Sequence, residues 1–140
     1  MNWRTILMLG LAFLLSPVFA TAQHDAKKAA AAAETVRWLT LVDGGKYGES
    51  WQAAAGYFQN AVTIDQWAQS LLAVRKPLGK RVSRTVQNMS YHTSLPGAPD
   101  GEYVVIQYAT AFANKASAVE TVTATLEEGG RWKVAGYFIK

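Results

Sequence analysis

Side chains suited to acid–base or metal chemistry are few in this sequence. It contains two histidines, His24 and His92, and no cysteine. His92 shares the alternation of Asn88 and Ser90, which predicts a surface or rim position on a strand; the alternative is a general base at the mouth of a pocket. His, Asp and Glu form no cluster with the spacing of metal ligands, so we expect no metal and no cofactor. No hydrolase signature surrounds any serine, so we predict no catalytic residue.

A basic cluster is the most concentrated charge in the chain. One reading is structural, because cations at the end of a helix are stabilised by its dipole. The other is contact with an anion, either a ligand bearing phosphate or carboxylate or a negatively charged envelope surface. The cluster places five positive charges within ten residues: Arg75, Lys76, Lys80, Arg81 and Arg84.

Glu120 is an acidic residue on an otherwise uncharged strand, in phase with Val122 and Leu126. If that face is buried, its carboxylate needs a partner, and Arg84 and Lys133 are the two candidates. A structural ion pair is favoured over an acid catalyst.

Aromatic residues offer a third kind of site. Most of them are expected in the core, because a large ring buries much apolar area. If the core is incompletely filled, a subset is expected to line an aromatic pocket for a small apolar ligand. Tyr91 and Tyr108 share a face of the sheet only in the register assumed here, since a slip of one residue would turn one of these side chains to the opposite face. This subset is Trp67, Tyr91, Tyr108 and Trp132.

Three helices are expected to precede the sheet. The first carries Thr35, Trp38 and Val42 at helical spacing and stops at residues 43–45, Asp-Gly-Gly. The second is short and runs from about Trp51 to Phe58. The third begins at a predicted capping box of Thr63 and Gln66 and ends near residues 77–79.

After Lys80 the apolar period changes from 3.6 to 2, which predicts strands. An irregularity at residues 86–88 indicates a bulge, and the Pro- and Gly-rich residues 95–101 indicate a loop. The predicted strands cover residues 85–95, 102–113, 117–126 and 131–139. The sequence therefore predicts an α+β fold with three N-terminal helices packed on a curved four-stranded antiparallel sheet.

The N-terminal residues 1–22 have the order of a secretory signal peptide: a charged start, an apolar run and a small-x-small site, with cleavage expected after Ala22. The apolar run is shorter than a membrane-spanning helix, so no stable anchor is expected after cleavage. We expect an exported protein, periplasmic or secreted. The missing cysteines exclude a lipid anchor, disulfides and thiol chemistry.

The mature domain is expected to cover residues 23–140, with the alanine-rich residues 23–33 frayed. Removing residues 1–22 takes away one of the 14 basic residues, and the 10 acidic residues then leave a net charge of +3. This modest charge, together with export, argues against nucleic acid as a partner.

Seven short strings occur in this order along the chain: WAQ (67–69), RKPLG (75–79), SR (83–84), LPGAPDGEY (95–103), FANK (112–115), ETVT (120–123) and WKVAGY (132–137). Together they are similar to the bacterial domain of unknown function 4019 family. The resemblance covers roughly residues 30–140, and it implies no activity or site residue. The order of elements also resembles the nuclear-transport-factor-2-like, or cystatin-like, architecture, a cone of bent sheet wrapped on helices.

Three functional readings remain open from the sequence. The favoured one is a non-enzymatic domain that binds a small ligand or an envelope partner. The second is a small cone-fold enzyme, such as an isomerase, dehydratase or hydrolase, that uses a pocket carboxylate or His92. The third is an assembly subunit, a homodimer that buries the outer face of strands such as residues 117–126.

Overall fold

The computed structural model describes residues 17–140. Four helices come first: α1 (Pro17–Asp43), α2 (Tyr47–Gln52), α3 (Gly56–Ala61) and α4 (Ile64–Leu78). Four strands follow: β1 (Arg81–His92), β2 (Tyr103–Phe112), β3 (Lys115–Glu127) and β4 (Arg131–Ile139). The predicted α+β class is confirmed.

The sheet is an antiparallel meander with strand order β1-β2-β3-β4. Each strand pairs with its neighbour in sequence. A loop of residues 93–102 joins β1 to β2, and short turns join the other pairs, as antiparallel pairing allows. The register shifts between Val86 and Asn88, so the bulge predicted there is confirmed. The shift returns Met89 and Tyr91 to the face that carries Arg84 before the bulge.

The helix count of three was wrong, because the predicted second helix is two short helices, α2 and α3. The break lies at Ala55, whose backbone is extended at φ −63° and ψ 150°. Its N–H donates to the carbonyl of Val134 on β4 at 2.7 Å, so the N–H of this residue is hydrogen-bonded to the sheet and not within a helix. Ala54 and Ala55 are both fully buried, and their small side chains let the chain approach β4 this closely.

The capping box that opens α4 is confirmed. The N–H of Gln66 donates to the Thr63 hydroxyl, and the Gln66 side chain accepts from the Thr63 N–H. The helix includes Pro77 and ends at Leu78, and its C-cap, Gly79, has φ +74° and ψ −163°. This conformation is essentially restricted to glycine, and it turns the chain into β1.

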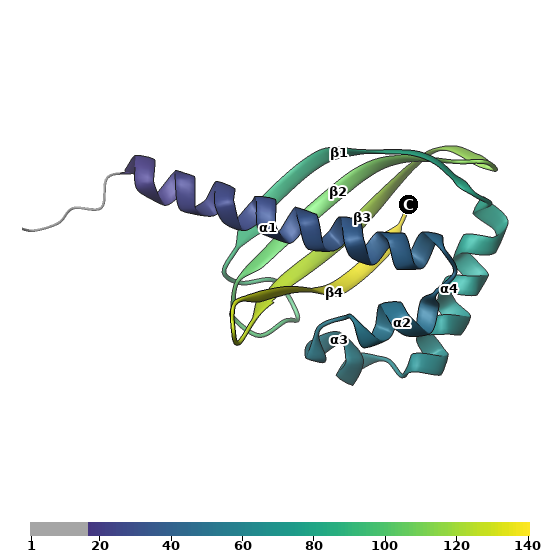
Figure 1. Ribbon diagram of the computed structural model, residues 1–140, viewed down its shortest axis with the longest axis horizontal. Helices are drawn as coiled ribbons and strands as arrows, with labels where there is room; N and C mark the ends of the chain where they lie inside the picture. Colours follow the sequence, from purple (N-terminus) through teal and green to yellow (C-terminus); the bar gives the residue numbers. More distant parts are fainter. Residues whose placement is uncertain (1–16) are drawn as a thin grey trace, which may run out of the picture.

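Helix α1 crosses one face of the sheet, and α4 lies at the end of the sheet where β1 begins (Figure 1). Helix α3 reaches the opposite end, where the Gly56 N–H donates to Glu127 and the Tyr57 hydroxyl donates to the Gly97 carbonyl. The core lies between α1 and the sheet, and it continues under α2 and α4. Trp38, Leu39 and Val42 of α1 belong to the same buried apolar cluster as Val122 and Val134 of the sheet. Burial of these apolar side chains supplies the main driving force for the fold.

The N-terminal predictions lie partly outside the described residues, because 1–16 of the predicted signal peptide are not among them. Residues 17–22 are helical in α1, and so are residues 23–33. Lys27 forms an ion pair with Glu102, and the ring of His24 stacks on Tyr91 with centroids 4.3 Å apart. Within residues 17–140, no helix combines the length and apolarity needed to cross a bilayer.

Candidate functional site

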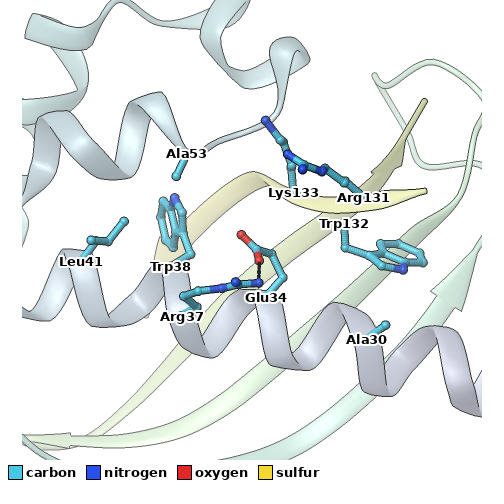
Figure 2. Close-up of a pocket in the computed structure, with 9 residues that line it drawn as sticks. All are labelled: Ala30, Glu34, Arg37, Trp38, Leu41, Ala53, Arg131, Trp132 and Lys133. Carbon is cyan, nitrogen blue, oxygen red and sulfur yellow. Dashed lines mark hydrogen bonds and ion pairs between the residues drawn. The ribbon is translucent and has the colours of Figure 1, made fainter. Parts of the chain in front are cut away.

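A groove of about 660 Å³ runs between α1 and the edge strand β4. Figure 2 shows Arg131, Trp132 and Lys133 contributed by β4, and Glu34 and Arg37 contributed by α1. Its size lies within the range of small-molecule sites. The lining residues are Ala30, Glu34, Arg37, Trp38, Leu41, Ala53, Arg131, Trp132 and Lys133.

The groove has apolar walls and a basic rim. Trp38 is 1% exposed and is held by a hydrogen bond from its indole N–H to the Ser50 carbonyl at 2.8 Å. Trp132 is 9% exposed, so both rings are fixed by packing. Alternation along β4 turns Arg131 and Lys133 away from Trp132, and because β4 is an edge strand their chains still reach the groove.

The charges of the groove are unevenly matched. Arg37 pairs with Glu34 one turn earlier in α1, and Lys133 lies 3.8 Å from Glu127. In the chain from residue 17 onward, Arg131 has no ion-pair partner and is exposed. The rim therefore offers one unpaired guanidinium group beside aromatic walls, a combination that suits an amphipathic anion.

A buried charge network lies apart from the groove and centres on Glu120, which is 0% exposed. Arg84 donates to both of its carboxylate oxygens, through Nε at 2.7 Å and Nη2 at 3.1 Å. The Thr110 hydroxyl donates at 2.6 Å, and the Tyr137 hydroxyl donates to Oε2. Four donors satisfy this carboxylate, as a buried charge requires. Lys133, the other candidate partner, pairs with Glu127.

Three arginine side chains form ion pairs with Asp43 at the C-terminal end of α1. Arg84 donates to both oxygens at 2.8 and 2.9 Å, Arg75 donates to Oδ1 at 2.9 Å, and Arg81 lies 3.0 Å from Oδ2. The basic cluster is thus divided: three arginines converge on one carboxylate, and the two lysines do not. Lys76 and Lys80 are exposed and line a cavity beside it.

The protonation states of the network follow from these contacts. Burial acts to raise the pKa of Asp43, but the hydrogen bonds and charges of Arg84 and Arg75 outweigh it and hold that pKa below its ordinary value. Burial acts to lower the pKa of Arg84, and the carboxylates of Asp43 and Glu120 outweigh it, so the net shift is upward. Burial and the Glu120 carboxylate both raise the pKa of Tyr137, which stays protonated and donates.

The four aromatic residues proposed for a pocket occupy different places. Trp67 packs edge-on against Phe58 in the core, with its indole N–H donating to the Ser50 hydroxyl at 2.9 Å. Tyr108 is 2% exposed, and its hydroxyl lies 2.6 Å from that of Thr35. Tyr91 lies near the C-terminal end of β1, and its hydroxyl donates to Glu102 at 2.7 Å. Trp132 lines the groove.

The two histidines lie at one side of the fold. His92 is half-buried at the end of β1, with Nε2 2.8 Å from the Ser90 hydroxyl. His24 stacks on Tyr91, also on β1. Because β1 and β4 are opposite edges of the sheet, neither histidine lies on the strand that forms the groove. Within residues 17–140, no three His, Asp or Glu residues group together as metal ligands would.

The sequence reasoning missed three residues that the structure places at these sites. Asp43 was read only as part of a helix stop, although it is the carboxylate on which the arginines converge. Trp38 was read as a core residue, and it also lines the groove. The sequence marks Arg131 only as the start of a predicted strand. Its neighbours Trp132 and Lys133, an aromatic ring and a second cation, were the features that could have indicated a binding site there.

The comparison with protein families bears on the whole domain. The sequence profile described as "Protein of unknown function (DUF4019)" matches residues 31–137. The chain belongs to the DUF4019 family. The match covers the groove from Glu34 to Lys133 and both acidic centres of the charge network in this DUF4019 domain.

The DUF4019 domain matches no curated protein and no solved structure at a significant level. The nuclear-transport-factor-2-like architecture and the homodimer through the outer sheet face stay predictions. Function must therefore be argued from the geometry of the domain.

Proposed function

We propose that the DUF4019 domain is an exported, non-enzymatic binding module that holds a small amphipathic anion in the α1–β4 groove. The apolar part of the ligand packs against Trp132 and Leu41, and its anionic group faces Arg131. The observation that carries the proposal is the Arg131 guanidinium, which has no ion-pair partner among residues 17–140, beside an open groove of about 660 Å³ with tryptophan in its wall.

The charge of the groove supports an anionic ligand. Three of its lining residues are cations, Arg37, Arg131 and Lys133, and one is an acid, Glu34. Glu34 is already engaged by Arg37, which leaves Arg131 and the weakly paired Lys133 to meet an incoming anion. A guanidinium group presents paired donors that match the oxygens of a carboxylate, sulfonate or phosphate.

Binding is favoured over catalysis because Glu34, the carboxylate that lines the groove, is paired with Arg37, and the other candidate acid–base groups, Glu120 and His92, lie elsewhere. Glu120 already accepts from Arg84, Thr110 and Tyr137, so its oxygens have no free position for a substrate proton. His92 lies on the opposite edge strand. A general acid or base would have to lie within hydrogen-bond reach of the substrate, and neither group meets that condition in the groove.

The groove is tested with 1-anilinonaphthalene-8-sulfonate, an amphipathic anion whose fluorescence reports apolar binding. The natural chain should bind it saturably, and Arg131→Gln should weaken Kd by about tenfold, the loss of roughly 1.4 kcal/mol. Trp132→Leu should reduce the fluorescence gain. Near-ultraviolet circular dichroism of each variant verifies its fold.

Lys115→Gln is the matched control for charge, because Lys115 is exposed at the opposite end of β3 from the groove. It should leave Kd unchanged. Equal weakening by Lys115→Gln and Arg131→Gln would show general charge attraction and overturn the groove as the site.

Export is tested by expressing the full chain in a bacterial host and determining the mature N-terminus by mass spectrometry. We expect a periplasmic or secreted product that begins near Gln23, because the small residues Ala20 and Ala22 form the predicted cleavage site. Replacing both with leucine should leave the precursor uncut. A natural chain that retains Met1 in the membrane fraction would contradict export.

A further inference from the structure

A second cavity, of about 320 Å³, is lined by the first residue of the edge strand β1, whereas the groove is lined by the other edge strand, β4. It is bounded by the C-terminal ends of α1 and α4, the first residue of α2 and the first residue of β1. Four of its lining residues are basic and one is acidic. The lining residues are Val42, Asp43, Tyr47, Leu72, Arg75, Lys76, Gly79, Lys80 and Arg81.

The one carboxylate of this cavity does not neutralise it. Asp43 is shared by Arg75, Arg81 and Arg84. Arg84 also pairs with a second carboxylate, that of Glu120, which is buried in the core. The four lining cations and Asp43 leave a net charge of +3 around the cavity. A cavity with walls of low dielectric concentrates such a field and attracts anions.

Arg75 is a buried cation with unused donors. It is 6% exposed, and its guanidinium group lies over the Phe112 ring at 4.9 Å. Nη2 donates to Asp43, but Nε and Nη1 have no hydrogen-bond partner among residues 17–140. Leaving donors of a buried charge unpaired is costly, so an acceptor at this position would stabilise the protein.

The side chains form a gradient from the interior to the surface. Arg75 is buried, Arg81 is 40% exposed, and Lys76 and Lys80 are exposed. An anion that enters past the lysines meets the guanidinium groups of Arg75 and Arg81, which also line the cavity. A phosphate group carries a charge of about −1.5 to −2 and several acceptor oxygens, which matches this site better than a single carboxylate.

We infer that the cavity lined by Arg75, Lys76, Lys80 and Arg81 is a binding site for a phosphate group. The phosphate is either inorganic or carried by a larger molecule such as a phospholipid. The site is independent of the groove, since the two cavities share no lining residue and lie at opposite edges of the sheet.

The test is an NMR titration of the ¹⁵N-labelled chain with inorganic phosphate at constant ionic strength, with acetate as the carboxylate arm. We expect saturable shifts of the Lys76, Gly79 and Lys80 amides with phosphate, at least tenfold tighter than with acetate. The double variant Lys76→Gln/Lys80→Gln should weaken phosphate binding at least tenfold. These lysines make no ion pair in the structure from residue 17 onward, so the variant keeps the fold.

The single variant Lys80→Gln should also weaken phosphate binding, and Lys28→Gln is its matched single-charge control. Lys28 lies 15 residues before Asp43 on α1, which is about 22 Å along the helix, so its removal should leave phosphate binding unchanged. Arg75→Met, if folded by circular dichroism, should abolish binding. Equal loss in Lys28→Gln and Lys80→Gln would overturn the site, and so would acetate binding as tightly as phosphate.

A second arm distinguishes the sources of phosphate. If inorganic phosphate does not bind, sedimentation with vesicles of phosphatidylglycerol should still retain the natural chain and lose Lys76→Gln/Lys80→Gln, which assigns the site to a lipid headgroup. If the natural chain binds neither inorganic phosphate nor the vesicles, the inference is overturned.

Discussion

Arg84 and Glu120 form a two-pronged ion pair inside the protein, with Nε to Oε1 at 2.7 Å and Nη2 to Oε2 at 3.1 Å. The same guanidinium group reaches Asp43 through Nη1 and Nη2. One side chain of β1 therefore joins the C-terminal end of α1 to the middle of β3. The helix is fixed on the sheet by charge as well as by apolar packing.

Replacing Arg84 with methionine should strongly destabilise the protein. The change leaves the fully buried Glu120 carboxylate without its cation, and breaking a buried pair in this way costs about 3–5 kcal/mol. Urea denaturation followed by circular dichroism measures the free energy of unfolding.

Arg81→Met is the matched comparison, because Arg81 also pairs with Asp43 but is 40% exposed. Its loss should cost about 1 kcal/mol or less. Similar losses for the two variants would contradict the central place of Arg84.

Acid stability should depend on Asp43. Its pKa is lowered in the folded protein, so the unfolded chain binds more protons and this residue stabilises the fold above its ordinary pKa of 3.8. That stabilisation is lost as the pH falls through the lower folded pKa. Denaturation midpoints between about pH 5 and pH 2 should fall steeply for the natural chain.

Asp43→Asn should flatten this acid dependence by up to one proton, or about 1.36 kcal/mol per pH unit. Glu102, whose pKa is also lowered, chiefly by its hydrogen bond from Lys27, is present in both chains and cancels in the comparison. An unchanged slope in Asp43→Asn would show that Asp43 does not carry the acid transition.

Gly79→Ala should destabilise the turn between α4 and β1. The residue has φ +74°, and an added Cβ would lie 3.0 Å from Nδ2 of Asn114 and 3.2 Å from Cβ of Ala113. Strain and crowding together should cost about 2–3 kcal/mol. Gly45→Ala shares a positive φ of +73° but meets no atom within 4 Å, so it should cost about 1 kcal/mol. Equal losses in thermal denaturation would show that crowding at Gly79 is unimportant.

The stability of the N-terminal half of α1 should depend on Glu102. Its carboxylate pairs with Lys27 and accepts from Tyr91. Glu102→Gln should speed amide hydrogen exchange near residues 24–28 by roughly twofold to fivefold, with exchange in the core strands unchanged. The exposed Glu128→Gln in the next turn should have no such effect. Faster exchange throughout the chain would point to global destabilisation instead.

Periodicity predicted most of the fold because it reports which face of each element is apolar. The strands, the bulge after Val86 and the capping box at Thr63 are local features that the sequence determines directly. The break at Ala55 could not be predicted, because it depends on a carbonyl of β4 that lies 79 positions further along the chain.

The candidate sites were predicted less well, for the same reason. The basic cluster was visible as a run of charge, but its convergence on Asp43 depends on how α1, α4 and β1 pack. Two of the proposed pocket aromatics, Trp67 and Tyr108, are filled core positions, since alternation predicts a face and not whether that face holds a cavity.

The hydrogen bond from the Ala55 N–H to the Val134 carbonyl has a consequence for solubility. An edge strand such as β4 presents unpaired backbone groups that can template pairing with another chain. In this protein the Ala55 N–H, at the α2–α3 junction, donates to the Val134 carbonyl near the centre of the strand, so this carbonyl is not available to another chain. The nearby Arg131 and Lys133 place charge along the same edge. The junction thus leaves one fewer unpaired backbone group on the β4 edge, and it does so without adding a fifth strand.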